Sequence, residues 1–101
     1  MNEVEFRNWL SKKGVNKKVQ SDCVSRLKRI ERELNHCDID EQYRSDRCEY
    51  LLSLFTRMGV NESMEQYSNT SLPIGKYYMN TYRHALKQYV KYCEDATNPM
   101  N

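Results

Sequence analysis

Apolar and polar positions alternate with the period of α-helices over most of the chain. Val4, Phe6, Trp9 and Leu10 precede Gly14, and glycine is typical of helix ends, so this stretch predicts a short first helix. The next stretch predicts a longer helix over about 17–36, with Asn16 as its cap. Its apolar residues recur at steps of three and four: Val19, Cys23, Leu27, Ile30, Leu34 and Cys37.

The second half of the chain predicts two more helices, separated by one irregular segment. Asp38, with Glu41 three residues later, fits a capping box and predicts a third helix over about 39–58, ending before Gly59. Residues 59–73 are rich in Asn, Ser and Thr and predict a loop that contains one helical turn near 62–67. The last predicted helix, over about 74–93, has this apolar stripe: Ile74, Tyr78, Tyr82, Ala85, Leu86, Tyr89 and Cys93.

This order of elements predicts an all-α fold, a single compact bundle of four to five helices. The chain has 101 residues, which suits one domain, and we expect it to cover 1–95 with a flexible C-terminal tail over 96–101. Three glycines and two prolines are few for an all-β chain, which needs frequent turns. No apolar run approaches the 18 or so residues of a membrane-spanning helix, so we expect a soluble protein without a membrane partner.

The four cysteines predict reduced thiols instead of disulfides. Cys23, Cys37, Cys48 and Cys93 are widely spaced, and the polar, acidic start of the chain does not resemble a secretory signal. Buried free cysteine behaves as a small apolar residue, which suits a cytoplasmic protein. Because no Cys or His residues have the close spacing of zinc ligands, we expect no metal and no cofactor.

The net charge of +2 is distributed unevenly along the chain. Residues 7–29 carry eight basic side chains and one acid, Asp22, while residues 76–92 carry four basic side chains and no acid. Residues 37–65, in contrast, hold three basic and seven acidic side chains. Both basic stretches are therefore candidates for a surface that neutralises phosphate groups.

On helical wheels, the basic side chains of both stretches fall opposite the apolar stripes. Lys and Arg can contact phosphates, whereas Ser and Asn can donate hydrogen bonds to the nucleic-acid backbone or to base edges. We therefore predict a nucleic-acid-binding module. The predicted contact residues are Lys17, Lys18, Ser25, Lys28, Arg29, Arg32, Lys76, Asn80, Arg83, Lys87 and Lys91.

The acidic segment over about 38–49 offers an alternative function. Acids at helix starts are expected for capping and for the helix dipole. They could also form the working face of a small phage-type inhibitor or adaptor that binds a protein, for example by blocking a nuclease. The residues of this alternative site are Asp38, Asp40, Glu41, Asp46 and Glu49.

No residue pattern predicts catalysis. Neither His36 nor His84 has a nearby Ser or Cys at a spacing that implies a nucleophile pair. Gly14, Gly59 and Gly75 are too isolated for a phosphate-binding glycine loop. We therefore expect a protein that is not an enzyme and has no small-molecule substrate.

Several motifs span residues 4–93: an opening of short helix, Gly14 and long helix; the segment Tyr50-Leu51-Leu52…Leu54-Phe55; and the closing Asn80-Thr81-Tyr82-Arg83-His84-Ala85-Leu86…Tyr89. Together they resemble the SAM-like, core-binding N-terminal domain of tyrosine recombinases and phage integrases. The resemblance implies a helical bundle that clamps one side of duplex DNA with its second and last long helices. It does not extend to strand cleavage, because the catalytic domain of that family has no room in this chain.

Overall fold

The computed structural model describes residues 1–67 and 69–97, and its regular elements are all helical. The all-α prediction is therefore confirmed, with no strand among the described residues. None of the helices in these two ranges is long and apolar enough to cross a lipid bilayer. The elements are α1 (Glu3–Lys12), α2 (Lys17–Glu33), α3 (Ile39–Asp46), α4 (Glu49–Ser53), the 3₁₀ helix η1 (Thr56–Gly59), α5 (Glu62–Glu65) and α6 (Met79–Thr97).

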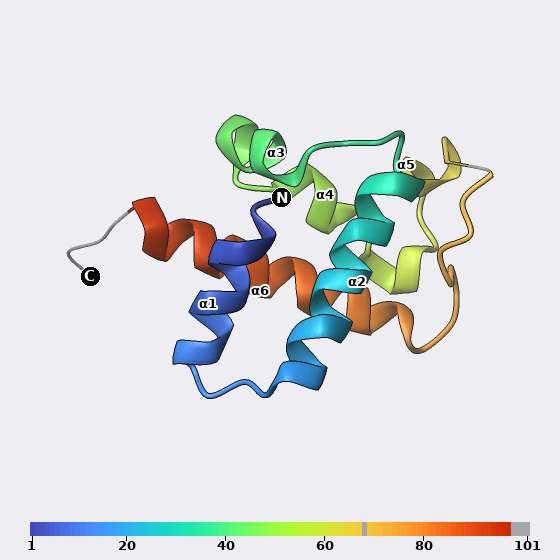
Figure 1. Ribbon diagram of the computed structural model, residues 1–101. Helices are drawn as coiled ribbons and strands as arrows, with labels where there is room; N and C mark the ends of the chain where they lie inside the picture. The colour runs from blue at the N-terminus through green and yellow to red at the C-terminus, as the bar shows by residue number, and fades with distance from the viewer. Residues whose placement is uncertain (68, 98–101) are drawn as a thin grey trace.

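The long helix α6 is the centre of the fold. It runs behind α1 and α2, which stand side by side, while α3 and α4 lie above it (Figure 1). Packing of α6 against α2 is the most extensive helix contact, and α1, α3, α4 and η1 also touch α6. The start of the chain lies beside α3, where the Met1 amino group is 3.3 Å from Asp40 Oδ2. Every other long element is therefore positioned by its contact with α6.

The core is formed where the apolar stripes of these helices meet α6. The fully buried side chains include Leu27 and Ile30 of α2, Phe55 before η1, and Leu86 of α6. At one end of the core, aromatic rings pack edge to face: the Phe6 ring centroid lies 5.0 Å from that of Tyr89 and 5.7 Å from that of Tyr92. This cluster fixes α1 against the C-terminal half of α6.

The first two helices follow the predicted pattern closely. Asn16 caps α2 as expected, because its Oδ1 accepts a hydrogen bond from the Val19 N–H at 2.9 Å. The helix ends at Glu33, three residues before the predicted end, since Asn35 and His36 have left-handed φ angles of 59° and 54°. Val4 and Val19 were expected among the apolar residues of these helices, but they are 68% and 49% exposed.

The prediction of one helix over 39–58 is wrong. Residues 39–59 form α3, α4 and η1, and the first break lies at Arg47 and Cys48, whose φ angles are 60° and 64°. The physical reason is the pattern of burial. Ile39 and Cys48 would point to opposite faces of one continuous helix, about 180° apart, yet both side chains are fully buried. Breaking the helix lets both residues reach the core.

The last helix begins later and ends later than predicted. Residues 74–78 form turns before Met79, and the Lys76 N–H donates to the Pro73 carbonyl at 3.0 Å. Tyr78, which was expected in the apolar stripe, is therefore 56% exposed. The helix continues through residues 96 and 97, which the sequence assigned to the flexible tail. The rest of that predicted tail, 98–101, lies outside the described residues.

Candidate nucleic-acid interface

The outer face of α6 carries exposed cations. Asn80, Lys87 and Lys91 lie on the side of the helix opposite the buried Tyr82 and Tyr89. Their side chains make no hydrogen bond or ion pair with any other residue in the described ranges. Residues 76–92 contain no acid, and the next acids along α6 are the exposed Glu94 and Asp95, about one turn beyond Lys91. These three side chains are therefore available to a ligand.

The other predicted residues at this end of the chain lie at the edges of that face. Arg83 is half-buried, and its Nε is shielded from solvent without a hydrogen-bond partner in the described part of the chain. Lys76 is exposed but lies in the turn before α6. His84 is exposed between Asn80 and Lys87, and its Nε2 lies 3.4 Å from Gln88 Nε2. We call Asn80, His84, Lys87 and Lys91 the α6 face.

The predicted cations of α2 divide between two sides of the helix. Lys28 points toward α1, where its Nζ lies 2.7 Å from Glu3 Oε1, and the hydrogen bond from Lys28 lowers the pKa of Glu3. Arg29 points toward α6 and donates to the Tyr82 hydroxyl at 3.0 Å and to the Ser71 carbonyl at 2.6 Å. Both side chains therefore join elements of the fold.

Three predicted residues of α2 have no such contact. Lys17, Lys18 and Ser25 are exposed and make no side-chain hydrogen bond or ion pair within the described ranges. Arg32 is also largely exposed, although its Nε lies 3.5 Å from Glu33 Oε2. The Arg32 side chain is 60% exposed and this contact is long, so the ion pair contributes little to stability.

Some predicted contact residues of α2 and residues of α6 line two hollows along the boundary between these helices, which we call the seam. One hollow of about 230 Å³ is lined by Asp22, Ser25, Arg26 and Arg29 of α2 and by Tyr82 of α6. A smaller hollow, of about 90 Å³, has a largely apolar floor, with Arg26 of α2 and with Thr81, His84 and Gln88 of α6 among its lining residues. Ser25 and Arg26 therefore adjoin the α6 face through His84.

The seam also reveals a residue that the sequence analysis missed. Arg26 was not in the predicted set because its wheel position lies beside the apolar stripe. Membership of the acid-poor stretch 7–29 was the signal that could have identified it. Lys28, in contrast, follows Arg26 by two residues and lies about 160° away around the helix. The structure thus separates Lys28 from the seam and adds Arg26 to it.

Most of the acidic segment serves the fold. Asp38 Oδ1 accepts the Asp40 N–H at 3.0 Å, Asp40 Oδ1 accepts the Tyr89 hydroxyl at 2.5 Å, and Asp46 Oδ2 accepts the Tyr50 N–H at 3.0 Å. Burial alone would raise the pKa of Asp38, but the Asp40 N–H and the Met1 ammonium outweigh it and lower that pKa.

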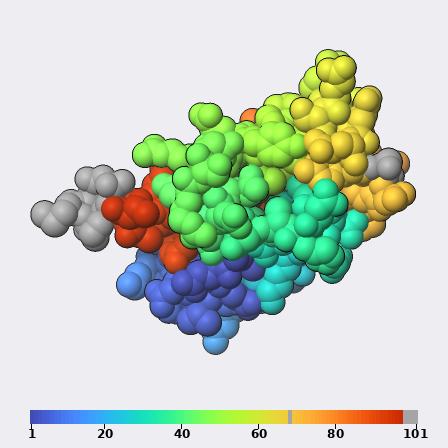
Figure 2. Space-filling view, turned by 90° about the horizontal axis from the view of Figure 1, so that it is seen from above, coloured from blue at the N-terminus to red at the C-terminus, as the bar shows by residue number. Residues whose placement is uncertain are grey.

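The two remaining acids of this segment, Glu41 and Glu49, are exposed and have no such partner in the described ranges. Figure 2 shows the face formed by α3 and α4, where the C-terminal end of α6 emerges at one side. Within the described ranges, the acidic segment therefore offers a partner only two free carboxylates, those of Glu41 and Glu49, on this face.

The four cysteines are free thiols in the structure. Burial raises the pKa of Cys23 and of Cys37 to about 11, and that of Cys48 and of Cys93 to about 12. These thiols are therefore protonated at neutral pH and are poor nucleophiles. Over residues 1–67 and 69–97, no three His, Cys, Asp or Glu side chains are grouped so that they could hold a metal ion.

Comparison with known proteins gives no relative. No protein-family model matches the chain, and no match is found among the curated proteins or the solved structures. The likeness to the core-binding domain of tyrosine recombinases therefore stays an expectation that rests on sequence motifs.

Proposed function

We propose that this protein is a non-catalytic nucleic-acid-binding domain that contacts the phosphates of duplex DNA through the α6 face and the adjoining seam. The observation that carries the proposal is the exposure of Lys87 and Lys91 on a stretch that lacks acids over residues 76–92. Free cations on a helix stretch without acids attract a polyanion and release its condensed counterions.

The length of the α6 face suits a nucleic-acid backbone. Asn80 and Lys91 are eleven positions apart, so the face extends about 16 Å along the helix axis. Over that length a duplex presents several phosphates. Ser25 and Arg26 widen the contact surface on the α2 side of the seam. The choice of duplex DNA, and binding without strand cleavage, come from the recombinase-like motifs.

Binding of a protein partner through the acidic segment has less support. Asp38, Asp40 and Asp46 are engaged by backbone N–H groups or by the Tyr89 hydroxyl. Only Glu41 and Glu49 remain free in that segment, so its charge is largely used within the fold.

Fluorescence anisotropy against a random duplex of about 30 base pairs, at several salt concentrations, tests the proposal. Each neutralised phosphate contributes about −0.9 to the slope of log affinity against log salt, and we expect a slope of about −2 to −4. Lys87→Glu with Lys91→Glu should weaken binding at least about tenfold and make the slope less steep by about 2.

The matched control is Lys12→Glu with Arg44→Glu, which changes two exposed cations on α1 and α3 by the same charge. We expect this control to alter affinity by less than about threefold, because distant charges are screened. No binding at low salt, or equal losses in both double variants, would contradict binding through the α6 face.

A further inference from the structure

The segment that leads into α6 exposes an unusual amount of apolar surface. Seven large apolar side chains of the described chain are exposed, and four of them lie between residues 60 and 78. They are Tyr77 at 84% exposure, Tyr78 at 56%, Val60 at 54% and Ile74 at 36%. Grouped exposed apolar residues of this kind mark binding surfaces more often than chance.

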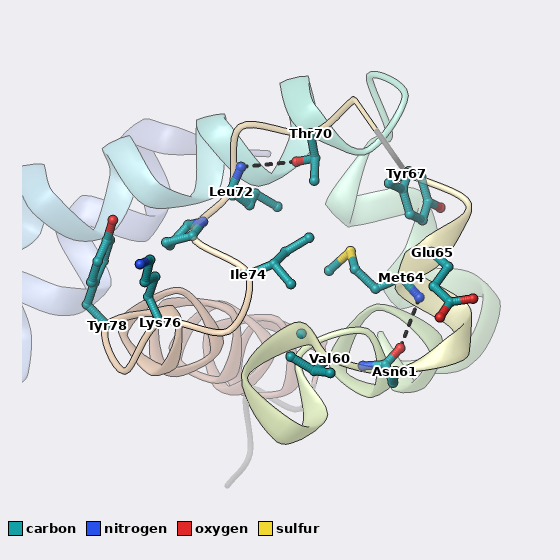
Figure 3. A pocket seen from close by; sticks show the side chains of 12 residues that line it. Val60, Asn61, Met64, Glu65, Tyr67, Thr70, Leu72, Ile74, Lys76 and Tyr78 are labelled. Atoms are coloured by element: carbon teal, nitrogen blue, oxygen red, sulfur yellow. Dashed lines mark hydrogen bonds between the residues drawn. The ribbon is translucent and has the colours of Figure 1, made fainter.

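A pocket of about 510 Å³ lies within this segment. Figure 3 shows the side chains of Met64, Leu72 and Ile74 converging on its interior. Tyr78 and Lys76 stand side by side at one edge (Figure 3). The pocket is thus apolar inside, with an aromatic ring and a cation together at its rim, and its volume falls in the range of ligand sites.

The walls of the pocket are fixed by contacts with the rest of the fold. Gly59 has a φ of +85°, and a Cβ at this position would lie 3.1 Å from Met79 Cε. Asn61 donates to the Leu54 carbonyl at 3.0 Å and accepts the Met64 N–H at 2.9 Å. The pocket is therefore largely formed before any ligand arrives, which lowers the entropic cost of binding.

Lys76, Tyr78 and Glu65 are lining residues whose polar side-chain groups are free within the described ranges. Neither the Lys76 Nζ nor the Tyr78 hydroxyl has a hydrogen-bond or ion-pair partner among the described residues. The side chains of Asn61 and Thr70, in contrast, are bonded within the fold, since Thr70 Oγ1 donates to Glu33 Oε1 and accepts from the Leu72 N–H. A ligand would therefore meet one cation, one phenol, the Glu65 carboxylate and an apolar floor.

We propose that this pocket receives an unpaired base of the nucleic acid that the α6 face holds. The base stacks on the Tyr78 ring and covers the exposed part of Ile74, while Lys76 contacts the flanking phosphate. Tyr78 precedes Asn80 by two residues, so the rim of the pocket and the start of the α6 face are neighbours along the chain. This inference rests on the proposed function and narrows its substrate class to nucleic acid with single-stranded or locally unpaired bases.

The chemistry of the rim favours a nucleotide over an apolar protein side chain. Every base offers a π face to a tyrosine ring, and its phosphate offers a negative charge to the adjacent cation. An apolar side chain would cover Ile74 but would leave the Lys76 ammonium beside a non-polar group. Tyr77, which precedes Tyr78 in the chain and is 84% exposed, offers a second ring for a neighbouring base.

Anisotropy titrations with two probes test the inference: a paired duplex, and the same duplex with a bulge of about three unpaired nucleotides. We expect the bulged probe to bind the unmodified protein about tenfold more tightly than the paired probe. Tyr78→Ala should reduce the affinity for the bulged probe about tenfold and leave the paired probe within about twofold. Tyr78→Phe is the matched control, because it keeps the ring and should keep the preference.

The outcomes separate this inference from the proposed function. Equal binding of both probes, or a preference that survives Tyr78→Ala, overturns the pocket but leaves duplex binding by the α6 face in place. A preference that depends on Tyr78 but not on Lys87 and Lys91 supports the pocket and overturns the α6 face. No binding of either probe at low salt overturns both.

A ¹⁵N titration with an oligo(dT) strand should shift the amides of Gly59 and Gly75 if the pocket is occupied.

Discussion

At the scale of single residues, the least expected feature is a set of left-handed backbone angles without glycine. Left-handed φ angles cost an L-residue about 1–2 kcal/mol and usually fall to glycine at helix ends. Three pairs of consecutive residues have φ angles between 54° and 64°: Asn35 with His36, Arg47 with Cys48, and Arg57 with Met58. Full burial of the Cys48 side chain offsets the cost of its left-handed angle. The Arg47 side chain is exposed, so no such burial offsets the cost of its angle.

Arg47→Gly should therefore stabilise the protein. Glycine removes the clash of the Cβ atom at a φ of 60°, and its greater freedom in the unfolded chain offsets part of that gain. We expect the free energy of unfolding in urea to rise by about 0.5–1 kcal/mol. Arg44→Gly, which removes the same charge from the interior of α3, should lower it by about 1 kcal/mol. Destabilisation by Arg47→Gly would contradict the cost assigned to this angle.

The residue contacts also show which features of the site could not be predicted from the sequence. The spacing of Asn80, Lys87 and Lys91 was sufficient to predict an exposed polar face, because helix periodicity is a local property. The engagement of Lys28 by Glu3 and of Arg29 by Ser71 joins residues 25 and 42 positions apart, respectively. No local pattern records such contacts, so these two cations were assigned to the ligand instead of to the fold.

At the scale of elements, the C-terminal end of α2 holds the segment before the pocket in place. Glu33, the last residue of α2, accepts hydrogen bonds from the Ser71 N–H and from Thr70 Oγ1 at its Oε1 atom. Arg29, one turn earlier, donates to the Ser71 carbonyl. The backbone hydrogen bond from Ser71 is the main cause that lowers the pKa of Glu33 to about 2.

This attachment should depend on pH in a defined direction. Because the pKa of Glu33 is depressed in the folded protein, its contribution is present above the ordinary glutamate value of 4.5 and is lost as the pH falls toward about 2. The Ser71 amide proton, followed by NMR, should titrate with a midpoint well below 4.5. Glu33→Gln should abolish that titration, and a midpoint near 4.5 in the unmodified protein would show that the hydrogen bond is weak in solution.

Element boundaries could be predicted where a local signal marks them. Asn16 caps α2 through its own side chain, and the helical turn of α5 falls where the sequence placed it. The breaks inside 39–58 carry no glycine or proline at Arg47 or Cys48, so the apolar spacing favoured one continuous helix. What decides the break is burial of Ile39 and Cys48 against the rest of the core, and that is a tertiary effect.

At the scale of the whole molecule, α6 has two different roles on its two sides. Its inner side packs against α1, α2, α3, α4 and η1, and its outer side is the proposed contact surface. A rigid helix held from several directions keeps exposed side chains at fixed spacing, which is what recognition of a regular backbone requires. The stability of α6 in the fold and the geometry of the proposed interface therefore depend on the same contacts.

Tyr89 of α6 makes hydrogen bonds to residues that are far from it in the sequence. Its ring is fully buried against Phe6, and its hydroxyl accepts the Asn2 N–H at 2.7 Å and donates to Asp40 Oδ1 at 2.5 Å. Burial is the main cause that raises the pKa of this phenol far above its ordinary value, so the hydroxyl stays protonated and remains a donor. One side chain of α6 thus connects the start of the chain with α3.

Tyr89→Phe should therefore cost more than its single oxygen suggests. The substitution keeps the ring packing but leaves the Asn2 N–H and the Asp40 carboxylate without this partner, which we expect to lower the free energy of unfolding by about 1–3 kcal/mol. Tyr92→Phe is the matched control, because the Tyr92 ring belongs to the same cluster and its hydroxyl makes no hydrogen bond within the described ranges. Its effect should stay within about 0.5 kcal/mol.

Urea unfolding followed by both far-ultraviolet circular dichroism and Trp9 fluorescence measures this difference. A loss of 1–3 kcal/mol would be a large share of the roughly 5–15 kcal/mol expected for a chain of this size. The two signals should coincide in each variant if α6 makes the helices one cooperative unit. Equal midpoints for the two variants would show that water replaces the Tyr89 hydroxyl without cost, and the start of the chain would then be held mainly by packing of Phe6.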